Sequence, residues 1–203
     1  VPGGIVMIDQ YRSQAKVFLD PVVSVAIRCR LTPNFFTIAA LLASAAAGIL
    51  FYLRMELWGV IAVMVNAFCD GMDGAVAREM KIQSKRGDFL DHAVDRYADI
   101  FIITGIFAGG MVPWLIGVFA LTGVLMASYL GTQAQAVGVG RYYGGILGRS
   151  DRLLLIIVVG IVDLIYPISL YGLSWFGWLF VFFGVFGHIT AFQRFAYVWA
   201  KVE

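Results

Sequence analysis

Charged side chains are scarce in this chain. Asp, Glu, Lys and Arg together make up only 14% of its 203 residues, whereas soluble domains carry about 25%. That shortage excludes an ordinary soluble globular protein, and the net charge of +2 is too small to indicate nucleic-acid binding. Cysteine is also rare, and Cys29 and Cys69 cannot build a disulfide framework. Residues 1–30 lack a continuous apolar run, so we expect no cleavable signal peptide.

Apolar residues take the place of the missing charge. Hydrophobic residues account for 61% of the chain and aromatic residues for 15%. This composition predicts an all-α integral membrane protein embedded in a lipid bilayer. Long apolar runs predict six transmembrane helices, at about residues 34–53, 57–78, 87–110, 112–136, 152–169 and 175–196.

The segment before the first span has a different character. Residues 5–30 mix apolar with basic side chains, which predicts an amphipathic helix on the membrane surface, with Pro21 as a candidate break. We therefore divide the chain into an N-terminal interfacial segment, residues 1–33, and a six-helix domain, residues 34–203. Lys and Arg concentrate in alternate loops, which places both termini in the cytoplasm of a multi-pass cell-membrane protein.

Four aspartates stand out against this apolar background. Asp70 and Asp73 are three residues apart, and Asp91 and Asp95 are four apart, so each pair shares one face of its predicted helix. Both pairs fall near the cytoplasmic ends of their helices. Ionised carboxylates at membrane depth need compensation, and converging oxygen ligands suit a hard divalent cation such as Mg²⁺. The sequence therefore predicts a metal centre in a cavity open to the cytoplasm.

The aspartates belong to a longer pattern of eight specified positions in 26 residues, Asp70-x₂-Asp73-Gly74-x₂-Ala77-Arg78-x₈-Gly87-x₃-Asp91-x₃-Asp95. Together with the preceding Pro33-Asn34-x-x-Thr37, this pattern resembles the signature of the CDP-alcohol phosphotransferases. The resemblance implies a membrane enzyme of phospholipid synthesis, in which an alcohol attacks the β-phosphorus of a CDP-linked donor and CMP is released.

The resemblance also implies roles for the acidic residues. Asp70, Asp73 and Asp91 would bind Mg²⁺ or Mn²⁺, with two ions expected. Asp95 would share the metal site and deprotonate the acceptor hydroxyl. Asp91 and Asp95 are therefore the predicted catalytic residues.

A second set of residues is implied for the nucleotide. Gly74, Ala77 and Arg78 would line the CDP site, helped by Asn34 and Thr37. The residue chemistry agrees, since a glycine lets a nucleotide approach the backbone and the guanidinium fork of Arg78 suits phosphate oxygens.

Two arginines after the fourth predicted span are candidates for binding a phosphorylated polyol acceptor. Arg149 and Arg152 resemble the phosphate clamp of the branch that uses inositol phosphate. The basic and acidic positions of that branch in the fourth span are here Gly131, Gln133 and Gln135, which leaves glycerol 3-phosphate open as well. The competing interpretation of the two arginines is a positive anchor at the membrane surface.

Other interpretations remain open at this point. The acceptor could be an alcohol without a phosphate, such as serine, and the donor could carry diacylglycerol or archaeol. A prenyltransferase and a cation transporter with intramembrane carboxylates are the alternatives from other classes. The family resemblance further implies a homodimer.

Overall fold

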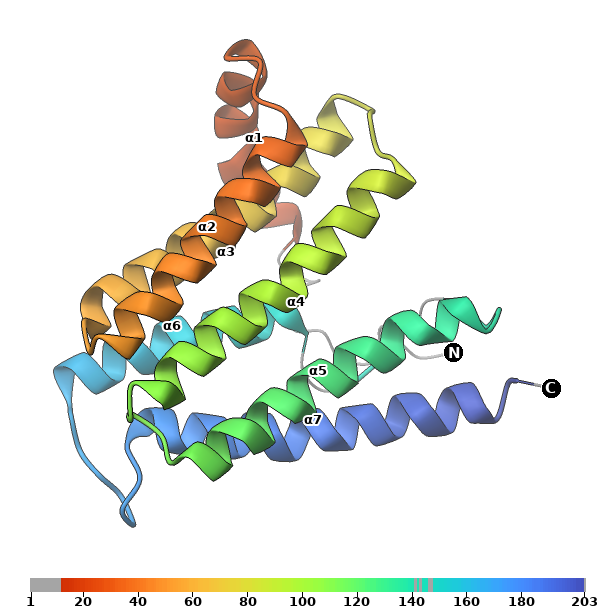
Figure 1. Ribbon diagram of the computed structural model, residues 1–203. Coiled ribbons are helices and arrows are strands. Elements are labelled where there is room, and N and C mark those ends of the chain that lie inside the picture. Colours follow the sequence, from red (N-terminus) through yellow and green to blue (C-terminus); the bar gives the residue numbers. More distant parts are fainter. Residues whose placement is uncertain (1–11, 141, 143, 146–147, 203) are drawn as a thin grey trace. The chain divides into compact units, whose positions relative to one another are not determined.

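Seven helices make up the computed structural model, which describes residues 12–140, 142, 144–145 and 148–202 (Figure 1). Within those residues the chain is all-α and has no strand, as predicted. The helices are α1 (Arg12–Arg28), α2 (Pro33–Tyr52), α3 (Glu56–Glu79), α4 (Lys85–Ala108), α5 (Trp114–Ala136), α6 (Arg149–Ile165) and α7 (Trp175–Trp199).

Four of the described helices, α2, α3, α5 and α7, are long and apolar enough to cross a membrane. The other two predicted spans correspond to α4, whose first turns are rich in charge, and to α6, which has 17 residues. The predicted end of the fifth span at residue 169 is wrong, because α6 ends at Ile165. Pro167 disfavours helical geometry at the residue before it, and Tyr166 has a non-helical backbone with φ −131° and ψ 76°.

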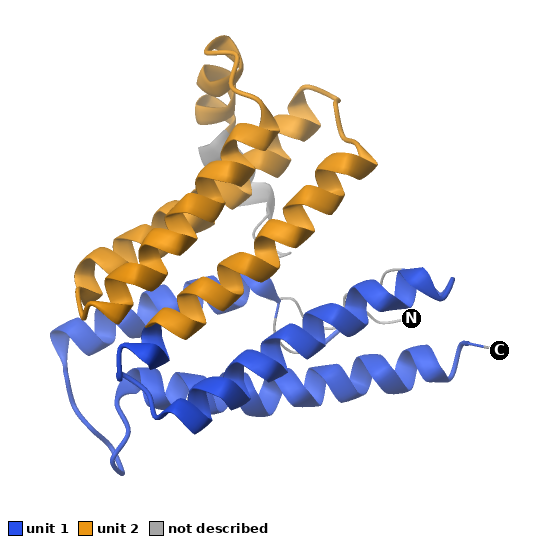
Figure 2. Cartoon of the chain, viewed as in Figure 1, with its two compact units in different colours: residues 1–7, 106–203 blue, residues 8–105 orange. Residues whose placement is uncertain are grey.

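The chain divides into two compact units, whose boundary lies between Gly105 and Ile106 near the end of α4 (Figure 2). We call residues 12–105 the N-terminal unit and the described residues from Ile106 onward the C-terminal unit.

The N-terminal unit begins with α1, which packs against the start of α2 and the end of α3. Its core cluster joins Val23, Ala26, Phe36, Met72 and Val76. The helix continues through Pro21, so the candidate break is not observed. Residues 5–11 of the predicted amphipathic helix lie outside the described residues.

Helix α2 starts at Pro33, directly after the capping residue Thr32 and ahead of a long apolar run. The Thr32 hydroxyl accepts a hydrogen bond from the Phe35 amide, and Pro33 occupies the first turn, where its missing N–H has no partner to lose. Further along, glycines let the neighbouring helices come very close. A methyl group on Gly105 would overlap the backbone of Gly48, and one on Gly48 would meet the Phe101 carbonyl oxygen.

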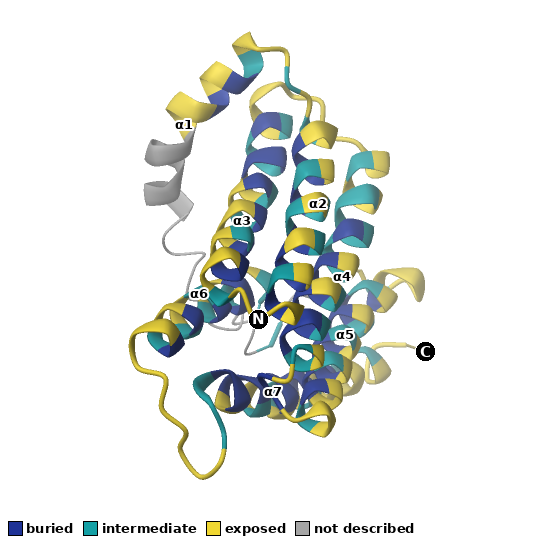
Figure 3. Ribbon diagram, turned by 60° about the vertical axis from the view of Figure 1, so that its left-hand side comes forward, coloured by how far each residue is buried: buried dark blue, intermediate teal, exposed yellow. Residues whose placement is uncertain are grey.

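The C-terminal unit packs α5 and α6 against α7. A methyl group added to Gly187 would lie 2.7 Å from the Gly123 carbonyl carbon, so the backbones of α5 and α7 are nearly in contact there. Throughout the described chain, buried positions follow one side of each spanning helix and large apolar side chains are exposed on the other (Figure 3). Such outward apolar faces are suited to lipid.

Candidate active site

Three of the four predicted metal ligands converge in the N-terminal unit. One carboxylate oxygen from each of Asp70, Asp91 and Asp95 lies within 4.8 Å of the other two, and all three residues are partly buried. Mg²⁺ holds oxygen ligands at about 2.1 Å, so two ligand oxygens can be up to about 4.2 Å apart. Small side-chain rotations would bring these carboxylates to a single ion, and their oxygen chemistry fits Mg²⁺ or Mn²⁺.

The link between α3 and α4 explains why these side chains meet. Lys81 adopts a left-handed conformation, φ 55°, two residues after the end of α3. Ser84 then opens α4, because its hydroxyl accepts from the Gly87 amide and its carbonyl from the Asp88 amide. The turn reverses the chain within five residues, 80–84, and so pairs the end of one helix with the start of the next.

Asp73, the fourth predicted ligand, has a different environment. Its side chain is buried, with 8% of the residue exposed, and its Oδ2 accepts a hydrogen bond of 2.9 Å from the Thr37 hydroxyl of α2. It is not a member of the three-carboxylate cluster. Its role as a ligand therefore stays a prediction, as do the individual roles of the other site residues.

Two further side chains of α4, Arg96 and His92, flank the cluster. Arg96 Nη2 lies 3.7 Å from Asp95 Oδ2 and 3.8 Å from Asp99 Oδ2. His92 Nδ1 lies 3.6 Å from Asp91 Oδ2 and 3.8 Å from Asp88 Oδ1. The helix therefore carries part of the positive charge that offsets its own carboxylates.

The predicted nucleotide residues lie on the same helix as Asp70, apart from two on α2. A methyl group added to Gly74 would lie 3.0 Å from Arg78 Nη1, so the guanidinium folds back over the glycine. Arg78 and Asn34 are exposed and Ala77 is partly buried. Thr37, by contrast, is buried, and its hydroxyl is engaged by a carboxylate of α3.

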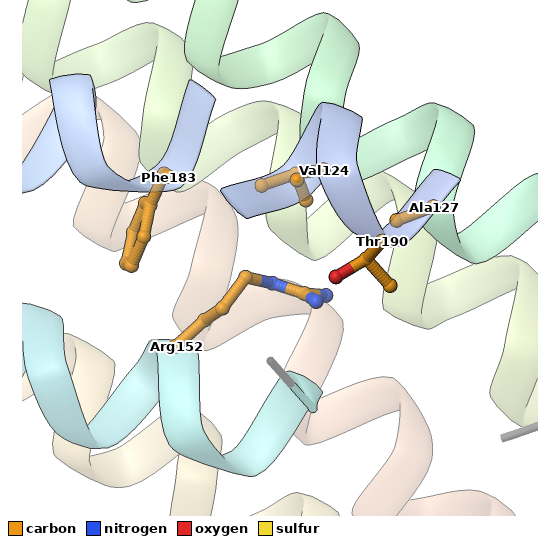
Figure 4. A pocket seen from close by; sticks show the side chains of 6 residues that line it. Val124, Ala127, Arg152, Phe183 and Thr190 are labelled. Carbon is orange, nitrogen blue, oxygen red and sulfur yellow. The ribbon is translucent and has the colours of Figure 1, made fainter. Parts of the chain in front are cut away.

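The two predicted acceptor arginines lie in the first turn of α6, in the C-terminal unit. Arg149 is partly buried and Arg152 is 5% exposed. The guanidinium of Arg152 extends toward the Thr190 hydroxyl (Figure 4). Burial of this charge among helices argues against a simple surface anchor. Arg152 lines a small cavity with residues of α5 and α7, namely Val124, Ala127, Phe183, Gly187 and Thr190.

Two further α7 residues in this region are not among the predicted site residues. Thr190 is fully buried beside the cavity. Arg194 Nε donates to the Gly144 carbonyl oxygen at 2.8 Å, and its Nη1 donates to the Ala127 carbonyl oxygen at 2.6 Å. Arg194 thus ties α7 to α5 and to the loop before α6. No local motif marks this arginine, because its two partners lie 50 and 67 positions away along the chain.

The family model of the CDP-alcohol phosphatidyltransferases matches residues 30–190. The chain belongs to that family. It is 32% identical to the archaetidylinositol phosphate synthase of Pyrococcus horikoshii over 173 residues, which cover 85% of this chain and 92% of the relative. The family assignment confirms the resemblance and makes the chain a membrane transferase of phospholipid biosynthesis, which removes the prenyltransferase and cation-transporter alternatives.

Solved structures of a related enzyme agree with this assignment. The phosphatidylinositol phosphate synthase of Mycobacterium tuberculosis with CDP-DAG bound has a TM-score of 0.76 and 26% identity to this chain, covering 88% of this chain and 92% of that one. A second structure of that enzyme, in complex with manganese and citrate, has a TM-score of 0.75 and 28% identity and covers 88% of both chains. A divalent metal in the relative is consistent with the acidic cluster of Asp70, Asp91 and Asp95 in this chain.

Proposed function

We propose that this protein transfers a phosphatidyl or archaetidyl group from a CDP-linked lipid to inositol phosphate and releases CMP. The observation that carries the proposal is the convergence of Asp70, Asp91 and Asp95 from two helices of the N-terminal unit. The names of the relatives, which are archaetidylinositol phosphate and phosphatidylinositol phosphate synthases, support inositol phosphate over glycerol 3-phosphate and over serine.

The proposed reaction is a single displacement at phosphorus. The acceptor hydroxyl oxygen forms a bond to the β-phosphorus, and the bond from that phosphorus to the bridging oxygen breaks, so CMP leaves with the electron pair. Asp95 takes the hydroxyl proton, a contribution that is typically worth about 10²–10⁴-fold. A divalent cation held by Asp70, Asp91 and Asp95, with Asp73 as a further ligand, would neutralise charge on the diphosphate. Two Mg²⁺ or Mn²⁺ ions are proposed.

The remaining residues bind and orient the two substrates. Arg78, folded over Gly74, is proposed to hold the diphosphate together with Ala77, Asn34 and the open backbone at the glycine. In phosphoryl transfer the protein contributes mainly positioning and charge stabilisation.

Arg149 and Arg152 are proposed to hold the phosphate of the acceptor. The guanidinium of Arg152 is buried, and a bidentate contact with phosphate gains strength from a low dielectric. Inositol without a phosphate has no anionic group for the two guanidinium groups, and serine offers them a single carboxylate where a phosphate offers three acceptor oxygens.

The architecture of the assembled enzyme is part of the same proposal. We propose six membrane spans that include α4 and α6, an interfacial segment over residues 1–33, a domain over residues 34–203, an active site open to the cytoplasm, and a homodimer. The charged start of α4 fits a position at the membrane surface, because the carboxylates need access to water and to CDP.

Purified protein in nanodiscs tests the reaction. CDP-diacylglycerol and CDP-archaeol are each combined with inositol phosphate, glycerol 3-phosphate, serine or inositol, and CMP release and the mass of the lipid product are measured. We expect CMP and a phosphorylated inositol lipid only with inositol phosphate. A product formed with glycerol 3-phosphate or serine instead, or turnover that persists in excess EDTA, would overturn the proposal.

A further inference from the structure

A buried hydrogen bond joins α2 to the acidic stretch of α3. Thr37 is 5% exposed and Asp73 is 8% exposed, and the bond of 2.9 Å between Thr37 Oγ1 and Asp73 Oδ2 spans 36 positions of sequence. The family resemblance implies a nucleotide role for Thr37, yet the structure directs its hydroxyl to a carboxylate. The nucleotide role therefore does not explain why the Thr37 hydroxyl is bonded to Asp73.

The Thr37 hydroxyl has two acceptors within reach but only one proton. The Pro33 carbonyl oxygen lies at 3.2 Å and Asp73 Oδ2 at 2.9 Å. A helix carbonyl is normally supplied by the backbone amide four residues on, and hydrogen bonds to an ionised carboxylate are about twice as strong as neutral ones. The Thr37 hydroxyl therefore donates its proton to Asp73 Oδ2. This hydrogen bond holds one carboxylate oxygen in place and fixes the side-chain torsion of Asp73.

We propose that Thr37 is a positioning residue that orients Asp73 toward a divalent cation held with Asp70, Asp91 and Asp95. This inference rests on the proposed metal centre. One oxygen of Asp73 is held by Thr37, so the other can be presented to the ion without ordering a mobile side chain. Groups that hydrogen-bond to metal ligands commonly change metal affinity about 10- to 100-fold when they are removed.

The test is Mn²⁺ affinity, measured by electron paramagnetic resonance of free Mn²⁺ with the full-length protein in nanodiscs. Thr37→Val keeps the shape of the side chain and removes the hydroxyl, and we expect it to raise the Mn²⁺ Kd about tenfold. Thr37→Ser should restore near wild-type affinity. In an Asp73→Asn background, Thr37→Val should have no further effect, because Thr37 acts through Asp73.

A second bond between α2 and α3 provides the matched control. Asn66 Nδ2 donates to the Ala40 carbonyl oxygen at 2.8 Å, so this bond ends on a backbone carbonyl instead of a carboxylate. Asn66→Leu should lower the unfolding temperature and leave the Mn²⁺ Kd unchanged. If Thr37→Val and Asn66→Leu alter thermal stability alike and neither alters Mn²⁺ affinity, the bond is only structural and the inference is wrong.

The outcomes also separate this inference from the proposed metal centre. Wild-type protein that fails to bind Mn²⁺ contradicts the metal centre itself, and the role of Thr37 falls with it. Wild-type binding with an unchanged Kd in Thr37→Val contradicts only the role of Thr37. Tighter binding in Thr37→Val would mean that the hydroxyl competes with the ion for Asp73, which also overturns the inference.

Discussion

The two compact units use similar apolar, glycine-bearing helices but differ in the charged groups that they bury. The N-terminal unit gathers carboxylates, with Asp73 and Asp99 buried and three further aspartates in a cluster. The C-terminal unit buries the guanidinium of Arg152 beside a small cavity, together with one carboxylate, Asp163. Carboxylates suit divalent cations and guanidinium groups suit phosphate. Under the proposed function, the carboxylates of the N-terminal unit act on the CDP-linked donor and the arginines of the C-terminal unit bind the acceptor.

The largest expected loss of activity follows from a substitution in the carboxylate cluster. Asp91→Asn removes a charged ligand, and we expect it to lower kcat about 10³-fold with every acceptor, because metal charge stabilisation is worth several kcal/mol. CMP release measures the rate. The control is Asp88→Asn, the same change on an exposed residue of the same helix outside the cluster, which should turn over close to the wild-type rate. Equal losses in both variants would contradict a specific role for Asp91.

A smaller and more selective effect is expected in the C-terminal unit. Arg152→Lys keeps the charge but loses the planar fork, and it should raise the KM for inositol phosphate about 10- to 100-fold, as for the loss of a hydrogen bond to a charged group. The KM for the CDP-lipid should stay the same. Arg149→Ala should behave likewise. An equal rise in both KM values would mean that the two arginines are general anchors and do not bind the acceptor specifically.

The smallest expected effects concern stability and should be alike in the two units. Gly105→Ala in the N-terminal unit and Gly187→Ala in the C-terminal unit each place a methyl group against a neighbouring backbone, and we expect a loss of about 1–3 kcal/mol in the free energy of unfolding. Gly71→Ala is the matched control, because no atom lies within 4 Å of its added methyl group. Thermal unfolding in detergent measures all three, and stability losses as large in the control would contradict the packing argument.

How far the sequence predicts this molecule also differs between the units. The pattern from Asp70 to Asp95 is continuous and its helices are joined by a short turn, so spacing on two helix faces predicts that Asp70, Asp91 and Asp95 converge. Spacing does not predict that Asp73 lies outside this cluster. Helix ends are predictable where a breaker precedes a long apolar run, as at Pro33. Pro167 lies within an apolar run, and hydrophobicity alone therefore extends the fifth span beyond the true end of α6.

The acceptor region is harder to predict because its parts are distant in sequence. Ala127, Arg152 and Thr190 come from three helices, and no periodicity within one helix reveals that they share a cavity. The same holds for the bond from Thr37 to Asp73. The sequence pattern indicates which residues have functional side chains, whereas packing between segments that are distant in sequence determines which of those residues are in contact.

The tight turn between α3 and α4 has a consequence for how the protein is made. Every residue needed to bring Asp70 beside Asp91 and Asp95 has been synthesised once α4 is complete, well before α7 exists. Because Arg96 lies on the same helix as Asp95 and Asp99, the two acids that it faces, this hairpin can enter the bilayer during translation with part of its acidic charge already offset.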